Sequence, residues 1–342
     1  MILVLNCGSQ SIKWKLFSDS LKKIKENDIA ITDHRNYVDF LLGELEKLSE
    51  HKADIRIIGH RIVHGGDKFT NITALDKDTL MELEKVNKLA PLHNPYNILG
   101  VKTAERVFPE AKQFGVFDTE FFANLSDIAR AYAVPKEITE KYGFKRFGFH
   151  GISHEYVAKI ASEKIKKPFN KLKIITCHLG GGASIAAIKN GKPMDTSMGF
   201  TPMEGLVMTT RSGSIDPGII LDLAEEFTVD KTREILNKES GLMGMCHTGE
   251  MLEVLEKIKN GDKLAQFALD VYAYSVKKYI GAYFAVLGGC DALVFTGSIG
   301  SGSAKIRNMI TKNIDILKKT KILAIKTDEE LAIAQKIIKN EK

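Results

Sequence analysis

Residues 1–17 (MILVLNCGSQSIKWKLF) and 173–190 (KIITCHLGGGASIAAIKN) share one pattern, and this pattern decides the fold class. Each stretch contains an apolar run, a glycine-containing turn and then alternating apolar and polar residues, which predicts a strand, a tight turn and a second strand. The turns align as Gly-x-x-Ser-Ile, at Gly8–Ile12 and at Gly181–Ile185. Because each copy opens one half of the chain, we predict a duplicated α/β unit.

Outward from these two turns, the chain alternates between strand-like and helical segments. Helical periodicity covers residues 37–48, 78–89, 97–107, 154–166, 217–227 and 263–287. Strand-like runs cover residues 55–58, 113–117, 292–296 and 321–325. This alternation predicts mixed sheets flanked by helices on both faces. The last segment, 329–339, is predicted to be a helix that returns to the first domain.

The length of 342 residues favours two domains of ordinary size. The 44% hydrophobic and 27% charged content is that of a soluble globular protein and argues against disorder. The chain has no Pro- or Ser-rich linker, so we expect the domain boundary within compact structure, near residues 119–150.

Charge and hydropathy exclude several classes of partner. The net charge is +6, but 40 of the 49 basic residues are lysines scattered over amphipathic segments, so we predict a solvated surface and no nucleic-acid partner. The most apolar long stretch, Val271–Gly289, contains Lys277 and Lys278, which argues against a membrane span. The N-terminus lacks the features of a signal peptide, so we expect a cytoplasmic protein. Four widely spaced cysteines fit neither a zinc site nor a redox pair and are expected to be reduced and inert: Cys7, Cys177, Cys246 and Cys290.

Two kinds of segment indicate anion binding. The turn between Asn6 and Lys13 contains Gly and Ser, which let backbone N–H groups approach an anion, and Lys13 adds charge. The glycine-rich run 296–303 (TGSIGSGS) follows a strand and precedes a helix, so it could hold a nucleotide at a helix start, although it is not a Walker A loop.

Arg61 and Arg211 give the strongest local signal. Arg61 lies in 59–66 (GHRIVHGG), and Arg211 lies in 195–213 (DTSMGFTPMEGLVMTTRSG). Both stand among glycines and small polar residues rather than on a helix face, where a salt bridge would be the ordinary explanation. Guanidinium groups bind carboxylate and phosphoryl oxygens in a bidentate manner, so the two arginines could clamp a transferring phosphoryl group.

Three further residues stand in turns beside predicted strand ends, where active-site groups collect. His93 lies in APLHNP (90–95), and His150 lies in GFHGISH (148–154). Asp118 ends an apolar strand and could position Mg²⁺, which prefers oxygen ligands.

Together these segments closely resemble the acetate kinase family, the acetokinase branch of the actin and sugar-kinase (ASKHA) superfamily. The resemblance covers nearly the whole chain, through the motifs above and through HLGGGAS (178–184), ESGLMG (239–244) and TDEEL (327–331). It implies two ribonuclease H-like ASKHA domains in a homodimer. The implied boundaries are 1–119 plus 331–342 for the N-terminal domain and 120–330 for the nucleotide-binding C-terminal domain.

The resemblance also implies roles for individual residues. Arg61 and Arg211 would bind acetate and the phosphoryl group, His93 and His150 would stabilise the transition state, and Asp118 would act with them. Asn6, Asp118 and Glu329 would hold Mg²⁺ or Mn²⁺. The methyl group of acetate would contact Val63, Leu92, Phe149 and Pro202. The nucleotide would contact Asn6, Ser9, Ser11, Lys13, His178, Gly180, Gly181, Gly182, Glu250, Met251, Gly297, Ile299 and Gly300.

The chain departs from the family pattern on the donor side. Gly181 replaces an Asn that can reach the donor phosphate, Leu252 replaces an Arg of the adenosine site, and Ser301 and Gly302 replace a Glu and an Asn. The chain is also shorter than typical members, with segments missing between Lys13 and Arg61 and around 246–250.

We therefore expect reversible, Mg²⁺-dependent phosphoryl transfer from ATP to acetate, giving acetyl phosphate and ADP, without a covalent intermediate. Within this class, another donor such as pyrophosphate or another nucleoside triphosphate remains open, as does propionate or butyrate. In a different class, the chain would be a catalytically silent nucleotide-binding ASKHA module.

Overall fold

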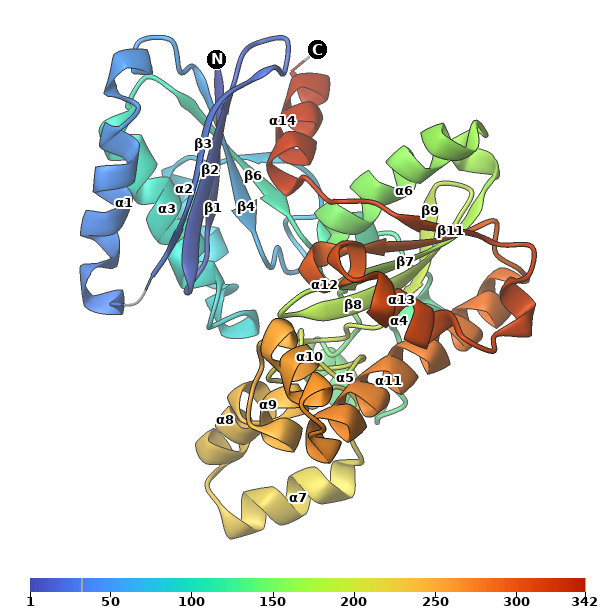
Figure 1. Ribbon diagram of the computed structural model, residues 1–342. Helices are drawn as coiled ribbons and strands as arrows, with labels where there is room; N and C mark the ends of the chain where they lie inside the picture. Colours follow the sequence, from blue (N-terminus) through green and yellow to red (C-terminus); the bar gives the residue numbers. More distant parts are fainter. Residues whose placement is uncertain (32, 342) are drawn as a thin grey trace. The chain divides into compact units, whose positions relative to one another are not determined.

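The computed structural model describes residues 1–31 and 33–341 and divides into two compact units (Figure 1). Unit 1 contains Met1–Ala123, Phe149–Ser153 and Asp328–Lys342, and unit 2 contains Asn124–Gly148 and His154–Thr327. Unit 1 thus takes in residues 120–123, 149–153 and 328–330, beyond the boundaries that the family resemblance implies. A backbone hydrogen bond from Gly151 N to Asp118 O (2.9 Å) helps tie the second of these segments to unit 1.

Unit 1 is built on a mixed sheet with the strand order β3-β2-β1-β4-β6-β5. β1 pairs antiparallel with β2, whereas β1, β4 and β6 are parallel neighbours. The strands are β1 (Ile2–Cys7), β2 (Ser11–Phe17), β3 (Lys23–Ala30), β4 (Ile57–Ile62), β5 (Thr73–Ala74) and β6 (Lys112–Phe117).

Helices cover both faces of this sheet. The helices of unit 1 are α1 (Tyr37–Glu46), α2 (Lys77–Glu84), α3 (Asn94–Val107) and α14 (Glu329–Asn340). Leu3 and Leu5 of β1 face the core beneath α1 and α3, while α14 packs on the other face. At Gly59 of β4, a Cβ atom would lie 2.6 Å from the Cδ1 atom of Ile337, so α14 packs against bare backbone there.

Unit 2 contains a second mixed sheet, with the order β11-β10-β7-β8-β9. β7 pairs antiparallel with β8 and parallel with β10, and β10 is parallel to β11. The strands are β7 (Lys173–Leu179), β8 (Ala183–Lys189), β9 (Lys192–Thr196), β10 (Ala292–Thr296) and β11 (Lys321–Ala324).

The two sheets repeat one topology. Counted along the chain, β1, β2, β3, β4 and β6 of unit 1 correspond in order and direction to β7, β8, β9, β10 and β11 of unit 2. Gly8–Ile12 and Gly181–Ile185 each span the turn between the first two strands of a sheet. The prediction of a duplicated α/β unit is confirmed.

Unit 2 carries more helices than the sequence pattern predicts. They are α4 (Asp127–Arg130), α5 (Lys136–Tyr142), α6 (Gly151–Ile165, which begins in unit 1), α7 (Pro217–Glu226), α8 (Val229–Lys238), α9 (Gly241–Cys246), α10 (Met251–Lys259), α11 (Lys263–Leu287), α12 (Gly297–Gly302) and α13 (Ala304–Thr311). His154 of α6 hydrogen bonds to Thr176 of β7, whereas the next strand residue, Cys177, lies near Tyr272 of α11. Helices α6 and α11 therefore cover opposite faces of the sheet (Figure 1).

None of the helices in the described part of the chain is both long enough and apolar enough to span a bilayer. The four cysteines are free, as expected; three of them are buried and Cys290 is half-buried. Burial raises the pKa of Cys7 and of Cys290 to about 12, which keeps these thiols unreactive.

Candidate active site

Three polar side chains of unit 1 stand at the carboxyl ends of neighbouring parallel strands. Asn6 is the penultimate residue of β1, Arg61 is the penultimate residue of β4, and Asp118 directly follows β6. Because parallel neighbours end at the same edge of a sheet, these strands deliver all three side chains to one place. The sequence predicted each of these residues separately, and the topology brings them together.

Arg61 is the centre of this group. Its guanidinium donates from Nε to Asp118 Oδ1 (3.1 Å) and from Nη2 to Asp118 Oδ2 (2.7 Å), which is a bidentate pair. Its Nη1 atom lies 3.0 Å from Glu329 Oε2 and 3.5 Å from Asn6 Oδ1. We call Asn6, Arg61, Asp118 and Glu329 the Arg61 cluster.

The Arg61 cluster carries more negative than positive charge. Burial alone would lower the pKa of Arg61, but Asp118 and Glu329 raise it above its ordinary value. Burial raises the pKa of Glu329 to about 7, and the Asp118 charge adds to this effect while Arg61 opposes it. One guanidinium therefore does not fully compensate two buried carboxylates.

A second group of charges, missed by the sequence analysis, supports Glu329 from behind. Lys15 of β2 contacts Asp328 Oδ1 at 2.8 Å and Glu330 Oε2 at 3.3 Å. Asp328 also caps α14 by accepting from Leu331 N (2.9 Å), and Glu330 accepts from Asn6 Nδ2 (3.4 Å). Of three consecutive acids, the outer two are thus tied down by Lys15 and only Glu329 reaches Arg61. The alternation of Lys13 and Lys15 on one face of β2 was the available signal.

The donor atoms of the Arg61 cluster fit a divalent cation of the Mg²⁺ type. Such an ion prefers oxygen ligands and is commonly held by one or two carboxylates together with substrate phosphates. Asp118 and Glu329 supply two carboxylates with surplus negative charge, and Asn6 supplies an amide oxygen. Among the described residues, no three His, Cys, Asp or Glu side chains are grouped so that they could hold a metal ion.

The turn that carries His150 is attached to the same strand end. His150 adopts a left-handed backbone conformation (φ 57°), which is strained for a residue with a Cβ atom. The next residue, Gly151, donates its N–H to Asp118 O, and a Cβ there would lie 2.3 Å from that oxygen. The strained turn therefore holds the backbone of His150 close to the backbone of Asp118.

Two asparagine side chains at the start of α3 hold the backbone of Val63 and His64 in place. Asn97 accepts from Val63 N (3.0 Å) and donates to Cys7 O (2.7 Å), so it joins the ends of β4 and β1. Asn94 makes a reciprocal pair with the backbone of His64. Neither asparagine was predicted from the sequence to belong to the site, although the Asn-Pro pair at 94–95 marks the helix start.

The remaining predicted residues of this region differ in exposure. Val63 and Phe149 are buried, whereas Leu92 is 44% exposed. The Phe149 ring contacts the His64 ring edge-on, with centroids 5.3 Å apart. His93 immediately precedes α3 and is half-buried.

In the predicted anion-binding turn, Gly8 N donates to Ser11 O (2.9 Å), and Ser9 and Ser11 are half-buried. Lys13, however, extends along β2 and pairs with Asp28 Oδ2 of β3 at 2.8 Å. The lysine charge is therefore directed to a neighbouring strand rather than to the turn.

In unit 2, two glycine-rich segments predicted to bind nucleotide meet at the end of β7. His178 pairs with Thr296 across β7 and β10, and Gly180–Gly182 forms the turn into β8. Gly297 has a positive φ of 77°, and a Cβ there would lie 2.4 Å from Leu179 O. α12 therefore starts directly against this turn, and its Ile299 and Gly300 are buried.

Arg211 lies in a long irregular segment between β9 and α7, which we call the Arg211 loop (residues 197–216). Its Nη1 atom donates to Pro202 O (3.3 Å) and lies 3.8 Å from Met208 Sδ. No acidic side chain of the described part of unit 2 pairs with it, and burial lowers its pKa. Arg211 thus keeps an uncompensated positive charge.

The Arg211 loop is joined to the nucleotide-type turn and to the start of α10. Thr209 donates from Oγ1 to Gly181 O (3.0 Å), and Gly249 packs against Thr209. Glu250 and Met251 follow directly, at the start of α10. Leu252 is 83% exposed.

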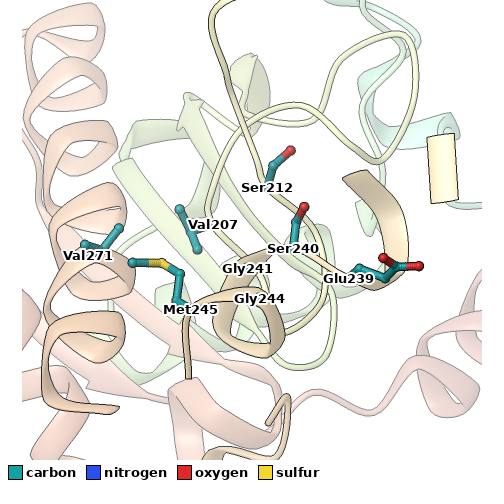
Figure 2. Close-up of a pocket in the computed structure, with 8 residues that line it drawn as sticks. All are labelled: Val207, Ser212, Glu239, Ser240, Gly241, Gly244, Met245 and Val271. Atoms are coloured by element: carbon teal, nitrogen blue, oxygen red, sulfur yellow. The ribbon is translucent and has the colours of Figure 1, made fainter. Parts of the chain in front are cut away.

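A hollow of about 420 Å³ lies on the α9 side of this loop (Figure 2). Its lining includes Val207, Ser212, Ser240, Met245 and Val271. It contains none of the residues predicted from the sequence to bind substrate or nucleotide, so it is not the candidate active site.

Known proteins resemble this chain over nearly its whole length. A family model described as the Acetokinase family matches residues 19–340. The acetate kinase of Carboxydothermus hydrogenoformans is 39% identical over 98% of both chains; that alignment spans 391 positions, so the relative contains segments that this chain of 342 residues lacks. The acetate kinase structure of Porphyromonas gingivalis matches with a TM-score of 0.90 and 35% identity, over 100% of this chain and 99% of that one. A propionate kinase structure from Francisella tularensis matches with a TM-score of 0.89 and 35% identity, over 98% of both chains.

Proposed function

Because the chain belongs to the acetokinase family, we propose that it catalyses reversible phosphoryl transfer from ATP to acetate, giving acetyl phosphate and ADP. The observation that carries the proposal is the Arg61 cluster: a guanidinium at the ends of three parallel strands, paired with Asp118 and with Glu329 at the start of α14. Transfer of a phosphoryl group demands positioning and charge neutralisation, and no covalent nucleophile.

In this proposal, each unit contributes one arginine, and the two arginines have different roles. Arg61 and His150 of unit 1, together with His93, bind and stabilise the transferring group, while Asp118 orients Arg61 through its bidentate contact. Arg211 of unit 2 binds an anionic oxygen, because its guanidinium has no acidic partner within its own unit. We assign the methyl group of acetate to the side chains that the family resemblance implies: Val63, Leu92, Phe149 and Pro202.

We assign a divalent cation, Mg²⁺ or Mn²⁺, to Asn6, Asp118 and Glu329. When bound, such an ion supplies charge neutralisation for phosphate oxygens. The residues themselves fit this assignment because the cluster holds an excess of buried carboxylate charge.

The nucleotide is assigned mainly to unit 2. We assign the phosphate oxygens to the turn of Gly180, Gly181 and Gly182 together with His178, and the segment with Gly297, Ile299 and Gly300 adjoins that turn. Glu250 and Met251 at the start of α10 contact the nucleoside. Asn6, Ser9, Ser11 and Lys13 form the phosphate end in unit 1, where the Lys13–Asp28 pair has to open.

Propionate is a second candidate acid. A propionate kinase matches this chain as well as an acetate kinase does, and Leu92 is too exposed to close off a small apolar contact completely.

We further propose a cytoplasmic homodimer. α7 contains Ile219, Leu221 and Leu223, yet none of its residues is buried, and Leu221 is 65% exposed. Phe267 and Tyr274 on α11 are also more than 60% exposed. A second copy of the chain would cover such apolar side chains. Analytical ultracentrifugation of the wild type and of Leu221→Asp tests the homodimer. A wild-type dimer that the substitution converts to a monomer supports the proposal.

A hydroxylamine trap for acetyl phosphate tests the activity. The purified protein is incubated with acetate or propionate, MgCl₂ and one donor at a time: ATP, GTP, ITP or pyrophosphate. Hydroxamate formation that requires acid, donor and divalent cation supports the proposal. Nucleotide binding without any turnover would instead indicate a silent ASKHA module.

A further inference from the structure

The Arg211 loop has to be held by contacts with the rest of unit 2, because it has no regular secondary structure. Irregular connections longer than about 12–15 residues are uncommon in compact domains and are usually functional. Its second half is fixed by α9: Leu242 N and Met243 N donate to Met208 O (3.1 Å) and Thr209 O (2.9 Å). Gly241 packs against the backbone oxygen of Arg211, with 2.8 Å to an added Cβ.

The first half of the loop is fixed by three side chains that we call the Arg146 clamp: Tyr132, Arg146 and Glu204. Arg146 donates from Nη2 to Glu204 Oε1 (2.7 Å). Its Nη1 atom donates to Thr196 O (3.1 Å) and to Ser197 O (3.3 Å), where the loop leaves β9. The guanidinium thus grips both the beginning of the loop and Glu204 within it.

Tyr132 completes the clamp from the other side. Its hydroxyl donates to Glu204 Oε2 (2.5 Å) and accepts from Phe200 N (2.8 Å). At Gly199 an added Cβ would lie 1.8 Å from Glu204 Oε2 and 2.0 Å from the Tyr132 hydroxyl. The Glu204 carboxylate and the Tyr132 hydroxyl therefore pack directly against the loop backbone. Together with Arg146, they link residues 196–204 into a closed ring of hydrogen bonds.

This ring determines where Pro202 points its carbonyl group. Pro202 lies between Phe200 and Glu204, the two loop positions that Tyr132 holds. The Pro202 oxygen accepts a hydrogen bond from the Arg211 guanidinium, which also lies near the Met208 sulfur. A chain of contacts therefore runs from Arg146 and Tyr132 through the ring to the Arg211 guanidinium.

We propose that Tyr132, Arg146 and Glu204 are positioning residues for Arg211, and that they set the affinity for the carboxylic acid substrate without touching it. The inference rests on the proposed function, in which Arg211 binds an anionic oxygen. The clamp also explains why Glu204, an acid close to Arg211 in sequence, leaves Arg211 uncompensated: both of its oxygens are engaged by Tyr132 and Arg146.

Tyr132→Phe tests the inference with the loss of one hydroxyl. We expect the KM for acetate to rise about ten-fold, the scale of one hydrogen bond that orients a charged group, while the KM for ATP stays within about two-fold. The matched control is Tyr142→Phe in the same unit, an exposed tyrosine stacked on Phe144. A purely structural role would change both KM values or neither, and that result would overturn the inference.

The same substitution in an Arg211→Ala background provides a second readout. If Tyr132 acts through Arg211, then Tyr132→Phe has no further effect on kcat/KM for acetate once Arg211 is gone. Independent, multiplicative losses would overturn the inference. Glu204→Gln keeps the shape of the side chain and is the second variant if Tyr132→Phe fails to fold; the same rise in KM for acetate is expected.

The outcomes also separate this inference from the proposed function. If the wild type forms acetyl phosphate and Arg211→Ala is impaired, but Tyr132→Phe and Glu204→Gln behave like the wild type, only the positioning role is wrong. A wild type that forms no acyl phosphate with any donor would overturn both.

Discussion

Arg61 and Arg211 differ in what balances their charge. Arg61 is paired with Asp118 and Glu329 inside unit 1, whereas Arg211 has a backbone oxygen and a thioether as its side-chain partners. The first arginine therefore contributes to the folded state as well as to a ligand site, because two buried carboxylates depend on it. In the function proposed above, the second carries a charge that is left for a ligand. Two arginines in similar glycine-rich segments thus differ in how much they contribute to the stability of the fold.

Arg61→Ala is expected to have the largest effect, because it removes both roles at once. We expect kcat to fall by about 10²-fold or more, and the free energy of unfolding to fall by about 3 kcal/mol, since two buried carboxylates lose their cation. Urea unfolding in EDTA and in MgCl₂ measures the second effect, and Mg²⁺ should restore part of the lost stability. Arg56→Ala, at an exposed ion pair with Asp19, is the control. Wild-type stability of Arg61→Ala in EDTA would break the comparison.

Arg211→Ala should lower kcat/KM for acetate by about 10²-fold while changing the free energy of unfolding by less than about 1 kcal/mol, because no buried carboxylate loses a partner. The hydroxylamine assay and urea unfolding together check this. Arg233→Ala, at an exposed helical pair with Asp230, serves as the control. A large loss of stability with intact turnover would reverse the roles that we assign to the two arginines.

Val63→Ala sharpens the comparison on the Arg61 side. Removing this buried side chain should open room for one or two carbons and raise kcat/KM for propionate relative to acetate by up to about ten-fold. Val107→Ala, a half-buried valine at the far end of α3, should leave the ratio unchanged. A wild type that already prefers butyrate would show that the apolar contacts are assigned wrongly.

Leu252→Arg addresses the Arg211 side and should have the smallest effect. The side chain is exposed, so the substitution is tolerated, and one new polar contact should lower the KM for ATP by about five-fold and increase selectivity for adenine. Ile128→Arg, at a still more exposed position of unit 2, adds the same charge elsewhere. A wild type that is already tight and strongly adenine-selective would contradict the reasoning, because the present leucine would then cost nothing.

Elements that are determined by a local sequence pattern could be predicted, and elements that depend on contacts with distant segments could not. The duplicated turns and the ends of β10 and α11 could be predicted because local periodicity determines them. α12, with the sequence GSIGSG, could not, because its glycines disfavour a helix by propensity and are there for the close approach to Leu179. β3 was missed because half of its residues are charged and most are exposed, so it shows no apolar run.

The candidate site divides in the same way. Arg61, Asp118 and Arg211 stand in local motifs and were found. The Lys15–Asp328 contact and the Arg146 clamp join segments that are far apart in sequence, and no local pattern indicates which lysine or acid will meet which partner. Supporting residues of a site are therefore the part that only the folded chain reveals.

The return of α14 to unit 1 has a consequence for how the chain is made on the ribosome. β1, β4 and β6 emerge first, but the helix that covers one face of their sheet and supplies Glu329 follows only after β7–β11 and their helices. At about 5–20 residues per second, the roughly 200 residues between β6 and α14 take about 10–40 s. During that time the sheet around Gly59 has an uncovered apolar face, and the Arg61–Asp118 pair forms without its third member. In the function proposed above, a nascent chain therefore stays catalytically silent until α14 has emerged, and a premature stop shortly before residue 329 is expected to yield a chain with an exposed sheet face rather than a weakened enzyme.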